Sequence, residues 1–248
     1  MKKLRILVNG AQGKMGQLAC KAIENSNHFE LVAQCTREND LAKTLAETQP
    51  DIAIELTNAD AVFENTKTII AAGVRPIVGA SGLTEEQMQI ISKSLAEKKQ
   101  GGMIVPNFSL GAVLMMQTAA TLAKYFPDVE IIEMHHDGKL DSPSGTAIQT
   151  AENINKAKTN SKTAKPGKET LKGARGATHY NIPIHSVRLP GLIAHQHVIF
   201  GNHGETLTIR HDTLNRDAFA PGILMACERV MCLNELEVGL DEALQKHK

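Results

Sequence analysis

The stretch LRILVNGAQGKMGQLACKAIE, residues 4–24, decides the fold. Leu4–Asn9 is apolar enough for a buried strand, glycines follow at 10, 13 and 16, and a helical pattern of apolar residues runs from Met15 to Glu24. Strand, glycine turn and helix in this order are typical of the first unit of a dinucleotide-binding fold. The glycines allow a tight turn and let a pyrophosphate approach the helix N-terminus. An ordinary β–α connection is the alternative.

Strand and helix patterns continue to alternate after this unit. Strands are predicted at residues 30–35, 51–56, 75–79 and 103–105, and helices at 59–72, 84–98 and 110–125. Two of the strands end in turns, Gly79-Ala80-Ser81-Gly82 and Pro106-Asn107-Phe108-Ser109. Open parallel sheets bind ligands at the carboxyl ends of their strands, so both turns are candidate cofactor contacts.

The end of the second strand predicts which dinucleotide binds. Thr36, Arg37 and Glu38 stand where this fold usually reads the adenosine ribose, about 20 residues beyond the glycines. No acid lies at the strand end itself to bind a 2′-hydroxyl, and Arg37 could pair with a 2′-phosphate. These residues favour NADPH, with NADH as the alternative if Glu38 reaches the ribose.

A second chemical segment, IIEMHHDGKLDSPSGT, spans residues 131–146. An apolar strand is predicted at 129–132, and His135, His136 and Lys139 follow it. Pro143-Ser144-Gly145-Thr146 then leads into a helix, whose first N–H groups and partial positive charge form an anion site. The backbone N–H groups of Ser144, Gly145 and Thr146 are therefore predicted donors for a substrate carboxylate. The alternative is a surface loop with Ser144 as an N-cap.

The rest of the chain suggests a second domain. A long mobile loop is predicted at 158–180, strands at 182–189, 195–200 and 205–211, and an amphipathic helix at 217–233 that returns to the first domain. The fold class is therefore α/β: a Rossmann-like dinucleotide-binding domain (1–109 and 216–248) plus an α+β substrate and oligomerisation domain with a mixed open sheet (110–215).

Composition excludes several classes of protein. Lys+Arg and Asp+Glu number 27 each in the 248 residues, so no overall charge favours nucleic acid or an anionic membrane. No run approaches the roughly 20 apolar residues of a membrane span. The chain is expected to be cytoplasmic, with its four cysteines (Cys20, Cys35, Cys227 and Cys232) as free, buried thiols.

Taken in order, the glycine fingerprint, GASG, PNFS and E-x-HH-x-x-K-x-D-x-PSGTA make the chain resemble the 4-hydroxy-tetrahydrodipicolinate (dihydrodipicolinate) reductase family. The last motif is long and specific, and the resemblance covers essentially the whole chain; its residues are Glu133, His135, His136, Lys139, Asp141, Pro143, Ser144, Gly145, Thr146 and Ala147. The resemblance implies hydride transfer from NADH or NADPH to a cyclic, unsaturated dicarboxylate in the diaminopimelate and lysine pathway.

The resemblance also implies roles for individual residues. His135 takes the position of the catalytic acid and Lys139 that of the proton donor, while His136, Gly145 and Thr146 take substrate-binding positions. Cofactor positions fall on Gly10, Ala11, Gln12, Gly13, Lys14, Met15, Gly79, Ala80, Ser81, Val105, Pro106, Asn107 and Phe108. No metal is implied, and the family's assembly is a homotetramer formed through the second domain.

Three segments depart from the family pattern. Many members have two threonines at Ala80-Ser81, and many have an acid at Thr36, which weakens any expectation of strong NADH preference. The run from Arg188 to His197 differs from the common form, so no catalytic role is assigned to His195 or His197.

Three other functions are compatible with parts of the sequence. A metal site could use His135, His136, Asp137, His195 and His197, although adjacent histidines on a strand point to opposite faces. A nucleotide-sensing regulator would have no use for Lys139 beside a carboxylate site. A dehydrogenase of the same fold with another amino- or keto-acid substrate is the third alternative.

Overall fold

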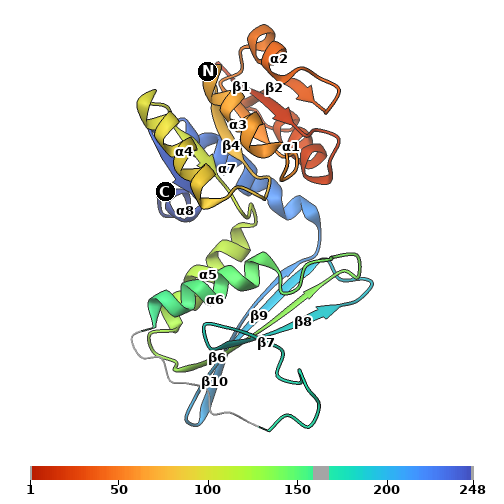
Figure 1. Ribbon diagram of the computed structural model, residues 1–248, viewed down its shortest axis with the longest axis vertical. Coiled ribbons are helices and arrows are strands. Elements are labelled where there is room, and N and C mark those ends of the chain that lie inside the picture. The colour runs from red at the N-terminus through yellow and green to blue at the C-terminus, as the bar shows by residue number, and fades with distance from the viewer. Residues whose placement is uncertain (1, 159–167, 247–248) are drawn as a thin grey trace. The chain divides into compact units, whose positions relative to one another are not determined.

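The computed structural model describes residues 2–158 and 168–246, which form two compact units (Figure 1). The first unit comprises the chain up to Leu110 together with the segment from Phe219 onward, and the second is Gly111–Ala218. Each unit is built around its own sheet.

Within the described residues, the first unit has a six-stranded sheet in the order β11-β5-β4-β3-β1-β2, and every pairing is parallel. Its strands are β1 (Leu4–Asn9), β2 (Phe29–Cys35), β3 (Ile52–Glu55), β4 (Arg75–Val78), β5 (Gly102–Ile104) and β11 (Leu236–Val238). Its helices are α1 (Lys14–Glu24), α2 (Leu41–Thr48), α3 (Val62–Ala71), α4 (Glu85–Glu97), α7 (Ala220–Val230) and α8 (Asp241–Lys246).

Helices cover both faces of this sheet. The strand order reverses direction after β2, so right-handed crossovers place α1 on one face and α2, α3 and α4 on the other. Contacts agree, because α1 packs against α7, while α3 packs against α2 and α4. The central strands are therefore buried on both faces and read as continuous apolar runs, such as Ile52–Ile54 at 0% exposure.

The second unit has a mixed sheet, with the order β10-β9-β6-β8-β7 in its described part. Its strands are β6 (Asp128–His135), β7 (Ala177–His179), β8 (Ile182–Arg188), β9 (Ala194–Asn202) and β10 (Glu205–Thr213). β6 runs parallel to β8, and the other pairings are antiparallel. The helices α5 (Leu110–Leu122) and α6 (Gly145–Ala157) lie over one face (Figure 1).

Side-chain alternation gives this sheet two different faces. On the helix-covered face lie Ile131, Val198 and Phe200, all at least 99% buried, since each points toward the helices. The opposite face, here called the open face, carries Ile132, Met134, Val187, His195, His197 and Ile199, which are only partly buried.

The structure changes several predicted boundaries. The strand predicted at 129–132 extends to His135, and α5 ends at Leu122 rather than 125. The helix predicted at 217–233 is a 3-10 turn (Arg216–Phe219) followed by α7, which ends at Val230. Four elements were not predicted: α2, β7, β11 and α8.

The predicted loop at 158–180 and the cysteines differ in part from expectation. The long loop expected at 158–180 falls partly on residues 159–167, which lie outside the described residues, while 177–179 within it form β7. All four cysteines are free as predicted, but Cys232 is exposed because it lies in the turn after α7. No helix in the described residues is long and apolar enough to span a membrane.

Candidate active site

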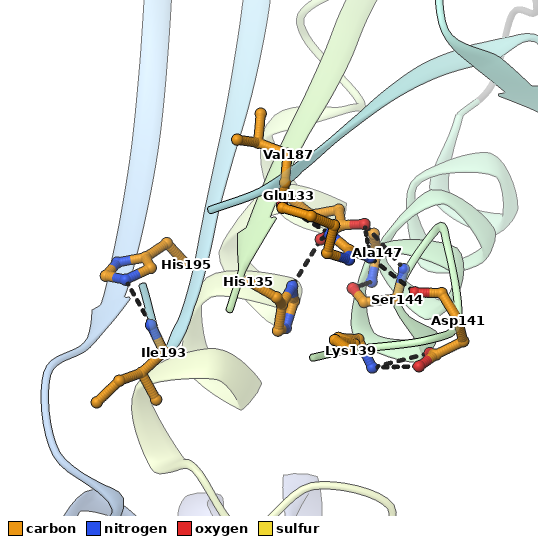
Figure 2. A network of polar contacts seen from close by, with 10 residues as sticks. Glu133, His135, Lys139, Asp141, Ser144, Ala147, Val187, Ile193 and His195 are labelled. Carbon is orange, nitrogen blue, oxygen red and sulfur yellow. Dashed lines mark hydrogen bonds and ion pairs between the residues drawn. The ribbon is translucent and has the colours of Figure 1, made fainter. Parts of the chain in front are cut away.

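A buried carboxylate organises the end of β6. The side chain of Glu133 is 0% exposed and accepts two hydrogen bonds from Arg188, one to each oxygen, both at 2.8 Å. The same carboxylate lies 2.6 Å from Nδ1 of His135 and accepts the backbone N–H of Ser144 at 3.2 Å (Figure 2). One side chain thus ties together the end of β6, the end of β8 and the start of α6.

These contacts determine the charge of Glu133. Burial alone would raise the pKa of this carboxyl, but hydrogen bonds from His135, Arg188 and Ser186 outweigh burial and lower the pKa to about 2. Glu133 also raises the pKa of the Arg188 guanidinium, mainly through their hydrogen bonds. The two form a buried, bidentate ion pair at neutral pH, beside the ring of His135.

Lys139 lies on the loop that follows the strand. A turn closed by the Lys139 N–H and the His136 carbonyl (3.2 Å) positions it. Its ammonium contacts both oxygens of Asp141, at 2.7 and 2.8 Å (Figure 2), and this contact lowers the pKa of the Asp141 carboxyl. The carbonyl of Asp141 accepts a further bond from Arg188 at 2.7 Å, so the same arginine supports both the strand and the loop.

The N-terminus of α6 begins directly after this loop. Ser144 is its N-cap, and the hydroxyl accepts the N–H of Ala147 at 3.3 Å. The Ser144 N–H donates to Glu133, so in this structure the N–H predicted to bind a substrate carboxylate is held by the protein's own carboxylate. Gly145 and Thr146 occupy the first two helical positions, at the positive end of the helix dipole. No acidic side chain lies in the first turn.

Of the predicted substrate residues, His136 is the one whose side-chain position the structure constrains least. It lies one residue beyond β6 and is partly buried, next to Gly138. His135, by contrast, is fixed by Glu133 and is 15% exposed.

His195 is not equivalent to His135. Its Nε2 accepts the N–H of Ile193 at 3.3 Å (Figure 2). Its Nδ1 lies 2.7 Å from Asp212, so both ring nitrogens are occupied. No group of three or more His, Cys, Asp or Glu in the described part of the chain could hold a metal ion.

Sequence reasoning missed the parts played by Glu133 and Arg188. The sequence did hold a signal of this role. Glu133 is two residues from Ile131 and therefore lies on the same, core-facing side of the strand, and a buried acid needs a partner. The partner lies 55 residues away along the chain, and spacing alone does not indicate which cation it is.

The first unit contains a separate group of predicted cofactor residues, around the N-terminus of α1. Gly10 has a positive φ of 86°, and a Cβ there would lie 2.6 Å from the Leu56 carbonyl oxygen, so glycine is needed. The N–H groups of Gly10 and Ala11 donate to the carbonyl of Cys35, at 2.9 and 3.0 Å. They hold the turn against β2 and are not available to a phosphate.

Lys14 and Met15 are better placed to bind phosphate. They are the first two residues of α1, which has neither a side-chain cap nor an acid in its first turn. A helix N-terminus with these properties fits an anionic pyrophosphate. Gln12 and Gly13 lie exposed in the preceding turn.

The two other predicted cofactor turns also lie at strand ends of this sheet. The N–H groups of Gly79 and Ala80 donate to the Glu55 carbonyl, and a Cβ on Gly79 would lie 2.5 Å from the Phe108 ring. Phe108 and Val105 are buried, so they support the turn by packing; Ser81, Pro106 and Asn107 complete the two turns. Arg37 lies exposed just beyond the end of β2.

These parts fit a dinucleotide. The uncapped start of α1, the close backbone approach at Gly10 and Gly79, and the exposed Arg37 all lie at or just beyond carboxyl ends of parallel strands.

Comparison with known proteins places both units in one family. Residues 4–108 match the family model of the dihydrodipicolinate reductase N-terminus, and residues 111–244 match that of its C-terminus. A 4-hydroxy-tetrahydrodipicolinate reductase from Legionella pneumophila is 51% identical over 242 residues, covering 98% of this chain and 100% of the relative. One from Coxiella burnetii is 49% identical over 241 residues, covering 97% and 99%.

A solved structure agrees with this match. The dipicolinate-bound dihydrodipicolinate reductase from Paenisporosarcina sp. TG-14 is 42% identical, with a TM-score of 0.88 and coverage of 97% of this chain and 99% of that one.

Proposed function

The chain belongs to the dihydrodipicolinate reductase family and is an oxidoreductase, and we propose that it reduces 4-hydroxy-tetrahydrodipicolinate to tetrahydrodipicolinate with a hydride from NAD(P)H and a proton from His135 and Lys139. The observation that carries this assignment of roles is the grouping of both proton donors with the N-terminus of α6 at the end of β6. The reaction belongs to diaminopimelate and lysine biosynthesis.

The proton donors neutralise charge that develops during reduction. The substrate ring becomes negatively charged and needs a positioned acid. Glu133 occupies Nδ1 of His135, so Nε2 is the nitrogen that faces the reaction. Lys139 is the second donor, held by Asp141 until a substrate carboxylate competes for its ammonium. General acid help of this kind contributes about 10²–10⁴-fold in rate.

The substrate carboxylates require fixed donors. Gly145 and Thr146 direct backbone N–H groups out of the helix N-terminus, and the imidazole of His136 adds a side-chain donor. Ser144 contributes indirectly, because its hydroxyl and N–H fix the first turn of α6.

We assign cofactor binding to the first unit, with NADPH preferred over NADH. Lys14 and Met15 would bind the pyrophosphate at the start of α1. Residue 36, at the end of β2, is a threonine and not an acid that could bind a ribose 2′-hydroxyl. Its N–H (2.8 Å) and hydroxyl (3.1 Å) both donate to Asn39. Arg37 is exposed there and can pair with a 2′-phosphate.

The test follows absorbance of NADPH, and in parallel NADH, with substrate made fresh by condensing pyruvate with aspartate semialdehyde. Oxidation should require the complete mixture. Lys139→Ala should lower kcat by about 10²–10⁴-fold while the protein remains folded. Arg37→Ala should raise the KM for NADPH and leave that for NADH unchanged. Full activity of Lys139→Ala would exclude the assigned role of Lys139.

We further propose a cytoplasmic homotetramer that has no nucleic-acid or membrane partner. The open face supports this assembly, because its apolar and imidazole side chains are covered by no helix in the described part of the second unit.

A further inference from the structure

We propose that Glu133 is the positioning residue of the reaction: its carboxylate orients the imidazole of His135 and keeps a proton on Nδ1, so that Nε2 exchanges the catalytic proton. The inference rests on the proposed function of His135 and goes beyond it. It assigns to a fully buried side chain an effect on the rate that acts only through its neighbour.

The geometry leaves Glu133 little freedom. Both oxygens are held by Arg188, and one of them also accepts the Ser144 N–H from the start of α6. The carboxylate therefore cannot turn away from the ring that lies 2.6 Å from it. A carboxylate fixed in this way holds the imidazole in one orientation, as fixed acids do beside catalytic histidines.

The charges support the same role. Arg188 balances the carboxylate, so Glu133 remains ionised and serves only as an acceptor. His135 must then direct Nδ1–H at Glu133 both before and after it gives a proton away. The neutral ring that remains has its lone pair on Nε2, ready to be protonated again from that side.

A second histidine in the same sheet, His195, shows what a catalytic histidine requires besides a carboxylate at Nδ1. His195 also faces a carboxylate through Nδ1, that of Asp212 at 2.7 Å. Its Nε2, however, accepts the Ile193 N–H, so no nitrogen remains for a substrate. Of these two histidines, His135 is the one that combines a fixed Nδ1 with an Nε2 for which the described residues show no hydrogen bond.

The experiment is a double-mutant cycle with Glu133→Gln, His135→Asn and the double variant, all as full chains. We expect Glu133→Gln to lower kcat by at least about tenfold, within the general-acid range, and to leave the KM for NADPH unchanged. In the double variant, kcat should fall no further than in His135→Asn alone, because residues that act as a unit are not additive.

Matched variants separate positioning from folding. Glu237→Gln removes a carboxylate from another bidentate arginine pair, with Arg229 in the first unit, and should leave kcat unchanged. Glu133→Asp keeps the charge but moves it away from the imidazole of His135 by the length of one methylene. This variant replaces Glu133→Gln in the kcat measurement if Glu133→Gln does not fold. The inhibition constant of dipicolinate reports whether each folded variant still binds a dicarboxylate.

Two results would overturn the inference: normal kcat in a folded Glu133 variant, or a double variant whose loss is the product of the two single losses. Normal kcat in His135→Asn by itself is a different failure, because it removes the proposed catalytic role of His135.

Discussion

At the residue scale, the charge of Glu133 should make stability depend on pH. Its pKa lies at about 2 in the fold, below its ordinary value of 4.5. Because the pKa is lower in the fold than in the unfolded chain, ionised Glu133 stabilises the fold at pH values above 4.5. That contribution is lost as the pH falls from 4.5 through about 2. The shift corresponds to about 3 kcal/mol for this fully buried group.

Urea unfolding of wild type and Glu133→Gln at several pH values tests this prediction. The variant should be less stable by about 3 kcal/mol at neutral pH, since it loses the buried carboxylate and leaves the partly buried Arg188 without this counter-charge. The difference should shrink as the pH falls below 4.5. A difference that stays constant down to the lowest pH at which wild type is folded would contradict the assigned charge.

Glu55, at the end of β3, should show the opposite dependence. Burial raises the pKa of this carboxyl, although hydrogen bonds from Thr57 and Asn9 oppose the shift. A raised pKa means that the fold binds a proton more readily than the unfolded chain, so ionisation of Glu55 destabilises the fold as pH rises.

Replacing Glu55 by Gln removes that ionisation. Relative to wild type, the variant should gain stability as the pH is raised from about 5 to about 8. Thermal unfolding across this range provides the measurement, with Glu237→Gln, which keeps Glu55, as the control. A loss of relative stability with rising pH would show that the hydrogen bonds outweigh burial.

Residue chemistry could be predicted from sequence where it is local. His135, Lys139 and the PSGT segment lie within twelve positions of each other, and the structure groups them at the end of β6 as the motif predicts. The pairing of Glu133 with Arg188 spans 55 positions and arises from the parallel register of β6 and β8. The Glu55 network likewise joins β1 to β3 across 46 positions.

At the element scale, the cap of α6 should matter for substrate as well as for stability. Ser144→Ala removes the hydroxyl that accepts the Ala147 N–H, which costs about 1 kcal/mol and lets the first turn fray. The donors at Gly145 and Thr146 would then be less well fixed. The KM for the dicarboxylate should rise while the KM for NADPH stays the same.

Thr84→Ala is the matched control. Thr84 caps α4 in the first unit through a capping box with Gln87, so its loss should cost a similar amount of stability. The KM for the dicarboxylate should not change in this variant. An equal rise in both variants would mean that general destabilisation, and not the start of α6, causes the effect.

Elements with strong local signals were predictable, and those formed by tertiary contact were not. The capping box of α4 and the alternation of β8 are visible in the sequence. By contrast, β11 has three residues of mixed polarity and exists because β5 offers it an edge. The strand β6 extends to His135 because pairing with β8 and β9 continues past its apolar run.

At the scale of the whole molecule, the open face of the second unit leads to a prediction about assembly. Ile199 lies on that face, opposite Glu130 on β6 and Thr208 on β10, and is only partly buried. An exposed sheet face with such side chains needs a covering layer, which a second copy of the same face can supply. The homotetramer proposed above should show about four times the mass of one chain by light scattering after size exclusion.

Ile199→Asp places a charge at the centre of this face and should produce smaller species, because a buried unpaired carboxylate opposes association. Ile90→Asp is its control. Ile90 is also an isoleucine, and it is 43% exposed, but it lies on α4 of the first unit. That variant should keep the mass of wild type. If Ile199→Asp also kept it, the subunits would have to meet through another surface.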